Sequence, residues 1–113
     1  MLSKIQEIKG INHIVEKVDL DNASIKSVAF QLKAQIDNLF LVLGGEDNGK
    51  ANLTVVISEN LINEKKLNAA DIIREIAKEI QGGGGGQPFY ATAGGKNVKG
   101  IENALKKAKL LAT

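Results

Sequence analysis

Two glycine clusters lie near the carboxyl end of the chain, and lysines follow them. Five consecutive glycines occupy positions 82–86, and a second pair, Gly94-Gly95, directly precedes Lys96. Glycines leave backbone amides bare, so consecutive amides can turn toward one point and form a concave site for an anion. The ammonium groups of Lys96 and Lys99 would add positive charge beside these amides. Phosphate is the natural counterpart of such a site.

A flexible linker is the alternative interpretation of the glycine run. The run contains no serine, it stops at Gln87-Pro88, and about 25 residues with clear patterns follow it. Flexible linkers instead mix glycine and serine over longer spans. We therefore expect an ordered loop that joins a helix to a strand and approaches a ligand.

Positive charge concentrates in the last part of the chain. Between Lys96 and Thr113 there are five lysines and one glutamate, whereas the whole chain has a net charge of only +2. That total is too small by itself to indicate a nucleic-acid binder. A solvated helix face accounts for these lysines as well as a binding surface does.

Two other candidate motifs are better explained as structure. The segment 44–51 resembles a phosphate-binding P-loop, but Ala51 stands where Ser or Thr would hold Mg²⁺, and a strand pattern follows it. We interpret this segment as a hairpin turn around Asn48-Gly49. His13 is the only histidine, and a zinc site usually needs several His, Asp or Glu ligands. We expect His13 to be a surface residue of a strand, and we expect no catalytic residue and no metal.

The neighbouring aromatic residues Phe89 and Tyr90 should point to opposite sides of an extended segment. One of them can pack in the core while the other offers a stacking face for a base. A purely structural role for both is an equal alternative.

Hydrophobic periodicity predicts the order β-β-α-β-β-α-β-α. We expect an α/β fold of the α+β-like kind, in which helices pack on a mixed sheet. The predicted strands cover residues 3–10, 11–20, 38–45, 51–58 and 88–93, and the predicted helices cover 21–37, 68–81 and 98–112.

Each predicted helix has an apolar face and a start or stop signal. In the first helix, Ile25, Ala29 and Leu32 recur at helical spacing. Asp21 or Asn22 can cap that helix, and Asn68 can cap the second one. We expect Gly82 to end the second helix in the left-handed conformation, and the last helix to bury a stripe that runs from Ile101 to Leu111.

Length and composition indicate a single domain over residues 1–113. The chain is 43% hydrophobic and 25% charged, which are ordinary values for a globular domain that buries a core. It has no cysteine, so a disulfide scaffold is excluded. No apolar run approaches the roughly 20 residues that span a bilayer, and the amino terminus lacks the apolar block of a signal peptide. We expect a cytoplasmic protein that does not bind membranes.

The stretch GGGGGQPFYATAGGK, followed by IENALKKAK, resembles the glycine-rich signature of the DHH-associated domain family. More specifically, it looks like the C-terminal (C-Ala) domain of alanyl-tRNA synthetases, and the resemblance covers nearly the whole chain. Two departures concern the phosphate contact that the family pattern implies. Gln87 stands where the family often has a basic residue, and Phe89-Tyr90 replaces a more polar pair.

The resemblance implies a non-catalytic, tRNA-binding fragment of a larger alanine–tRNA ligase, without a cofactor. Such a domain binds the outer corner of tRNA and helps bring the aminoacylation and editing centres to the same molecule. The implied partners are an alanine-specific tRNA and the aminoacylation and editing domains of the parent enzyme, which can be a homodimer. The candidate RNA contacts are Gly82, Gly83, Gly84, Gly85, Gly86, Gln87, Gly94, Gly95, Lys96, Lys99, Lys106 and Lys107.

Two alternative functions use the same glycine-rich segment. Related glycine loops in DHH-type phosphoesterases bind the substrate, while the metal-binding acids lie in another domain. A substrate-binding domain of such an enzyme is therefore one alternative. A module that binds a nucleotide or the carboxylate of a protein partner is the other.

Overall fold

The fold is seen in a computed structural model, which describes residues 6–8, 10–18, 21–47, 49–64 and 66–111. The strands are β1 (Gln6–Ile8), β2 (Ile11–Val18), β3 (Leu39–Asp47), β4 (Lys50–Ile57), β5 (Gly82–Gln87) and β6 (Tyr90–Gly95). The helices are α1 (Asn22–Gln35), α2 (Glu59–Glu64), α3 (Ala69–Ile76) and α4 (Ile101–Leu111), with the short 3₁₀ turns η2 (Ala77–Ile80) and η3 (Val98–Gly100).

The six strands form one mixed sheet in the order β1-β2-β3-β4-β6-β5. Helix α1 connects β2 to β3, which are parallel, and every other neighbouring pair is antiparallel. The predicted α/β architecture, with helices packed on a mixed sheet, is confirmed.

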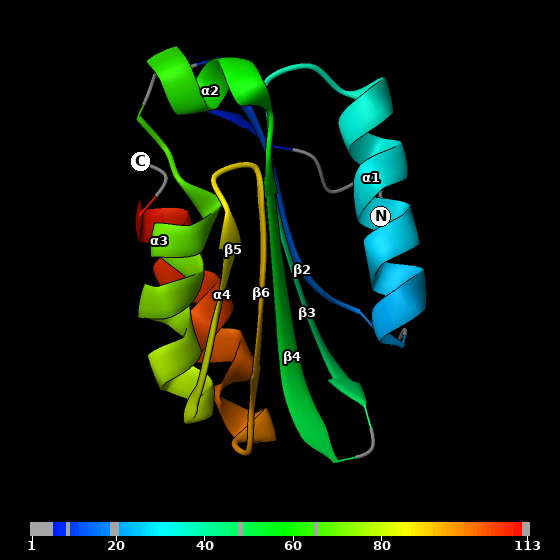
Figure 1. Cartoon of the computed structure of the whole chain (residues 1–113), viewed down its shortest axis with the longest axis vertical. Helices are drawn as coiled ribbons and strands as arrows, with labels where there is room; N and C mark the ends of the chain where they lie inside the picture. Colours follow the sequence, from blue (N-terminus) through cyan, green and yellow to red (C-terminus); the bar gives the residue numbers. More distant parts are fainter. Residues whose placement is uncertain (1–5, 9, 19–20, 48, 65, 112–113) are drawn as a thin grey trace.

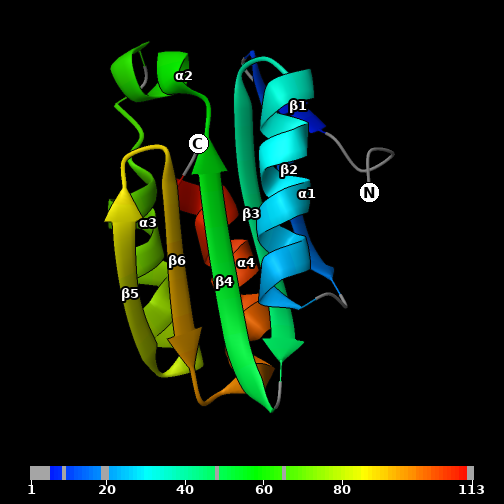
Figure 2. The same ribbon diagram turned by 45° about the vertical axis from the view of Figure 1, so that its right-hand side comes forward.

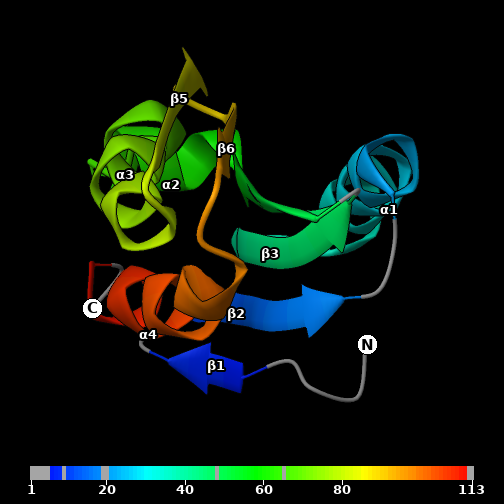
Figure 3. The same cartoon turned by 90° about the horizontal axis from the view of Figure 1, so that it is seen from below.

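Helices cover the two faces of the sheet unequally (Figure 1). Helix α3 packs on β4, β5 and β6, and α4 packs on β2 and β3, so both lie on the same face. Helix α1 lies alone on the other face, over β3 and β4. Figure 3, seen from below, places α1 on one side of the sheet and α3 with α4 on the other.

Strand β3 lies at the centre because its side chains are buried on both faces. Phe40 and Val42 belong to the core under α3 and α4, while Leu39, Leu41 and Leu43 belong to the core under α1. All five side chains are fully buried. Such a continuous apolar run is typical of a strand that is covered on both sides.

The predicted amino-terminal helix caps are confirmed. The Asp21 carboxylate accepts a hydrogen bond from the backbone amide of Ser24, and this bond lowers the pKa of Asp21. The Asn68 side chain accepts from the amides of Ala70 and Asp71. The prediction for the end of the second helix was wrong by one residue, because Gln81, not Gly82, adopts the left-handed conformation.

Strands β3 and β4 form the predicted hairpin in place of a P-loop. Asp47 lies opposite Lys50, and Gly49 has the positive φ of 77° that such a tight turn requires. The other expected turn residue, Asn48, lies outside the described residues.

Three further differences concern the helices and the last predicted strand. Helix α2 was missed, because its six residues are too few to show a helical period. Pro88 and Phe89 form the turn between β5 and β6, so the last strand begins at Tyr90. Leu111, expected in the buried stripe of α4, is 41% exposed, because the stripe ends at Ala108.

His13 is buried, so its expected place on the surface was wrong. Its side chain lies on the face of β2 that α4 covers, its ring centroid is 5.4 Å from that of Phe40, and only 4% of the residue is exposed. Its Nε2 atom has no hydrogen-bond partner among the described residues. Burial therefore lowers the pKa of His13, because the charged imidazolium loses its hydration.

This burial predicts a pH-dependent stability. The unfolded chain binds a proton on His13 at a higher pH than the folded chain does, so stability falls as the pH drops below about 6.5. Urea unfolding at pH 8 and pH 5.5 should show this loss in the wild type and a smaller loss in His13→Leu. An equal loss in both proteins would assign the pH dependence to other groups.

Candidate nucleic-acid interface

The glycine run is ordered, but it is a strand and not a loop. Gly82 to Gly86 and Gln87 form β5, the edge strand of the sheet, which pairs antiparallel with β6. The expected concave cradle of amides is therefore absent from β5, because successive N–H groups of a strand point in opposite directions. The bare backbone lies along an edge instead, where outward N–H and C=O groups are free to bind.

Alternate glycines of β5 have no room for a side chain. A Cβ atom at Gly82 would lie 1.9 Å from the carbonyl oxygen of Gly94, and one at Gly84 would lie 2.1 Å from that of Thr92. In contrast, a Cβ at Gly83 or Gly85 would meet no atom within 4 Å. Close packing on β6 thus requires glycine at every second position, while the intervening positions face open space.

The two glycine clusters predicted from the sequence lie side by side. Gly82 is opposite Gly95, and Gly83 is opposite Gly94, where β5 begins and β6 ends. A Cβ at Gly95 would lie 2.2 Å from the carbonyl oxygen of Ile80, so this second glycine also permits close packing.

Hydrogen bonds hold both ends of the β5–β6 hairpin. At its open end, the amide of Asn97 donates to the carbonyl of Ile80 (2.9 Å). At its turn, the amide of Ala69 donates to the carbonyl of Pro88 (2.8 Å), and the amide of Ile57 donates to that of Phe89 (2.9 Å). The hairpin is thus tied to η2, α3 and β4.

The four candidate lysines divide into two groups. Lys96 and Lys99 follow β6, are exposed, and form no ion pair with a described residue. Lys106 is also exposed, but it lies further along the chain, on α4 beside β2. Only the first group adjoins the glycine hairpin.

Lys107, which is only partly exposed, has its charge balanced within the protein. Its ammonium lies 3.6 Å from the carboxylate of Glu75 and 3.8 Å from that of Glu79. A hydrogen bond from Lys78, with a smaller contribution from Lys107, holds the pKa of Glu75 below its usual range. Lys107 thus joins α4 to α3 and η2, and its charge is less available to a ligand than the charge of Lys96.

The sequence did not reveal a polar surface on the face of the sheet opposite α3. Helix α1 lies in front of β3 and leaves β6 and β5 uncovered in Figure 2. Lys26 of α1, Asn52 and Thr54 of β4, and Thr92 of β6 line a groove there. The alternation of polar and apolar residues in both strands indicates that one face of each is polar. It does not indicate which face of the sheet lacks a helix.

The two aromatic residues of the hairpin are both partly buried, and each meets a lysine. The ring of Tyr90 lies 5.0 Å from that of Phe30 and 5.9 Å from the ammonium of Lys26. The ammonium of Lys33 lies 4.7 Å from the ring centroid of Phe89. Neither ring is a fully exposed stacking platform.

The fold agrees with the comparisons to known proteins. The profile of the DHHA1 domain matches residues 10–113, and the chain belongs to this family. The resemblance to the C-Ala domain of alanyl-tRNA synthetase is confirmed as well. The solved C-Ala domain from Aquifex aeolicus alanyl-tRNA synthetase has the same fold, with a TM-score of 0.80, 22% identity, and coverage of 97% of this chain and 99% of that one.

Curated relatives are alanine–tRNA ligases. The chain is 55% identical to that of Christiangramia forsetii over 106 residues, and 50% identical to that of Bacteroides thetaiotaomicron over 113 residues. These alignments cover 94% and 99% of the chain but only 12% and 13% of the ligases. The chain thus corresponds to a small part of the length of these relatives.

None of the helices in the described part of the chain is long and apolar enough to cross a membrane. The described residues also contain no group of three or more His, Cys, Asp or Glu side chains that could hold a metal ion.

The glycine geometry predicts opposite results for two neighbouring substitutions. Gly84→Ala should lower the free energy of unfolding by about 1–3 kcal/mol, because its methyl group meets the backbone of β6. The matched control Gly85→Ala should change it by less than about 1 kcal/mol, in the stabilising direction, because alanine restricts the unfolded chain. Urea titrations followed by circular dichroism measure both values. Equal destabilisation of the two variants would contradict this close packing.

Proposed function

We propose that the chain is a non-catalytic, tRNA-binding accessory domain of an alanyl-tRNA synthetase. The observation that carries this proposal is the 55% identity to an alanine–tRNA ligase over 94% of the chain. In this proposal the domain binds the outer corner of an alanine-specific tRNA, its partners are the aminoacylation and editing domains of the parent enzyme, and it uses no cofactor. The site of action is the cytoplasm, and the full-length enzyme can be a homodimer.

The chemistry of the surface supports RNA as the ligand. Lys96 and Lys99 offer ammonium groups that form no ion pair with a described residue, beside the exposed backbone of the glycine hairpin, where phosphates of an RNA chain can approach closely. Proteins bind folded RNA mostly by its shape and through phosphate and 2′-hydroxyl contacts. A flat surface with few bulky side chains suits this kind of recognition.

Binding of the tRNA corner by a separate domain explains how the same bound tRNA can reach two catalytic centres. While the domain holds the tRNA, the acceptor end moves between the aminoacylation and editing centres without leaving the enzyme. Each transfer is then intramolecular, and the linked sites give the acceptor end a high effective concentration at either centre.

The relatives favour this function over a phosphoesterase substrate domain or a general nucleotide-binding module, since those reported above are all alanine–tRNA ligases. The alternative nevertheless gives a direct test. Mn²⁺-dependent hydrolysis of a nucleotide substrate by the pure chain would contradict a purely non-catalytic role.

Binding should respond to the lysines beside the hairpin. The chain should bind an alanine tRNA transcript more tightly than an unstructured RNA of equal length. Lys96→Gln combined with Lys99→Gln should weaken binding and reduce the slope of log K against log salt by about 0.9 for each lost phosphate contact. Filter-binding titrations over a salt series measure both effects.

Lys78→Gln is the control, because the ammonium of Lys78, which lies in η2, already pairs with the carboxylate of Glu75 at 3.3 Å. Its affinity and salt dependence should equal those of the wild type. If the double variant bound tRNA as the control does, the hairpin lysines would not be part of the interface. If the wild type did not discriminate folded tRNA from the unstructured RNA, the proposed function itself would be wrong.

A further inference from the structure

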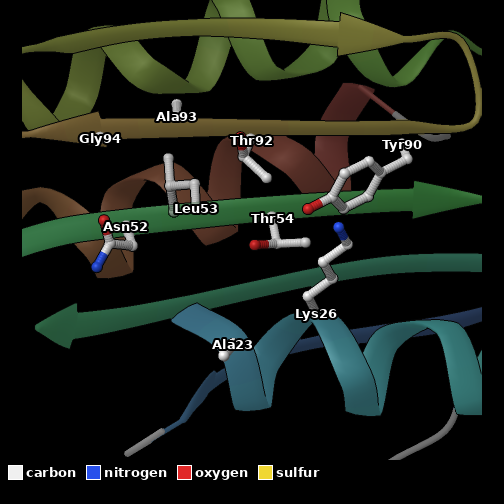
Figure 4. Close-up of a pocket in the computed structure, with 9 residues that line it drawn as sticks. All are labelled: Ala23, Lys26, Asn52, Leu53, Thr54, Tyr90, Thr92, Ala93 and Gly94. Atoms are coloured by element: carbon white, nitrogen blue, oxygen red, sulfur yellow. The ribbon is translucent and has the colours of Figure 1, made fainter. Parts of the chain in front are cut away.

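The groove between α1 and strands β4 and β6 (the α1–β6 groove) has a volume of about 400 Å³, which is within the usual range for a small-ligand site. Its polar lining consists of Lys26, Asn52, Thr54, Tyr90 and Thr92 (Figure 4). We propose that this groove binds a single unstacked nucleoside unit of a folded RNA, with its phosphate at Lys26. The inference rests on the proposed function and adds Lys26 of α1, Asn52 and Thr54 of β4, and Tyr90 and Thr92 of β6 to the candidate RNA contacts.

The floor of the groove is a set of cross-strand rows. Thr54 lies opposite Thr92, which lies opposite Gly85, and Asn52 lies opposite Gly94. Directly opposed residues point to the same face of a sheet. A Cβ at Gly85 would meet nothing within 4 Å. The floor thus carries short polar side chains at one side and bare backbone at the other, so a flat ring can lie against it.

The polar groups of the groove have unused hydrogen-bonding capacity. The side chains of Asn52, Thr54 and Thr92 make no hydrogen bond to another described residue. Thr54 is only 6% exposed, but its hydroxyl is not among the buried side-chain atoms that lack a partner, so the hydroxyl is accessible from the groove. The amide of Asn52 and the two threonine hydroxyls can each donate and accept hydrogen bonds. The polar edge of a base and the hydroxyls of a ribose need partners of both kinds.

The charge of the groove selects an anion. Lys26 is the one charged residue among those that line it, and its ammonium forms no ion pair with a described carboxylate. Figure 4 shows the side chains of Lys26 and Tyr90 reaching toward the same region above Thr54. Lys33, further along α1, differs because its ammonium lies 3.6 Å from the carboxylate of Glu59. A phosphate at Lys26 would therefore leave its ribose and base beside the hydroxyls.

Tyr90 supplies an aromatic surface that is held in place. Its ring packs at 5.0 Å from that of Phe30, and Lys26 lies 5.9 Å from its centroid. RNA-binding proteins commonly take up unstacked bases of loops and bulges against such aromatic rings. An isolated unpaired nucleotide of a folded RNA therefore suits this groove better than a continuous duplex does.

Two variants separate the charge from the hydroxyls. For the 113-residue chain and an alanine tRNA transcript, Lys26→Gln should weaken binding and lower the salt slope by about 0.7, the value per phosphate of a single strand. Thr92→Val keeps the shape of the side chain and should weaken binding about three- to tenfold, the usual net effect of one hydrogen bond, without changing the slope. Lys109→Gln is the charge-matched control, because Lys109 is exposed on α4, on the opposite face. Thermal melts of all variants confirm that they fold.

The outcomes distinguish this site from the proposed function. If the wild type binds tRNA and both groove variants bind as Lys109→Gln does, the groove inference is wrong while RNA binding by the domain stands. If the wild type does not bind tRNA, both proposals fail. In NMR titrations, shifts of the Thr54 and Thr92 amides on tRNA addition would support the inference. Shifts of these amides only with another domain of the ligase would assign the groove to a protein contact and overturn it.

Discussion

The close approach of β5 to β6 is the constraint that determines the structure of the exposed β5 edge of the sheet. Backbone carbonyls of β6 occupy the space where side chains of Gly82 and Gly84 would lie. Glycine loses more conformational freedom on folding than any other residue, so five in succession oppose strand formation. Packing of α3 against the hairpin and the hydrogen bonds at both of its ends offset this cost. The result is a thin edge whose backbone is accessible.

The unequal cover of the sheet decides which surfaces can bind. On one face, α3 and α4 cover the sheet from β2 to β5, and Lys107 contributes its charge to the contacts between those helices. On the other face, α1 covers the centre and leaves β6 and β5 to solvent (Figure 2). Residues of α4 that look like a basic binding helix in the sequence are therefore partly structural. The polar side chains that line the α1–β6 groove lie on the uncovered face instead.

Periodicity and helix caps predicted most of the fold, because they are local signals. The apolar face of α1 and the Asn68 cap follow directly from spacing and side-chain chemistry. The strand at 82–86 could not be predicted in this way, since glycine has low strand propensity and no side-chain alternation. His13 was misplaced because the burial of its face depends on α4, which is distant in sequence. The α1–β6 groove was missed for the same reason: long-range packing determines which polar residues share a surface.

The five identical glycines of β5 do not by themselves specify the register of this strand against β6. In most strands, alternating side chains fix the pairing, because a shift by one position would expose the apolar set. Here only the attachments outside the run, at Ile80 and at Pro88, set which glycine meets which residue of β6. The number of glycines between these attachments is consequently as important as their identity. With the attachment at Ile80 kept, one deleted glycine would put Gln87 at the position of Gly86, where a Cβ would lie 2.5 Å from the carbonyl oxygen of Tyr90. Evolution should therefore conserve the length of this segment more strictly than the side chains around it.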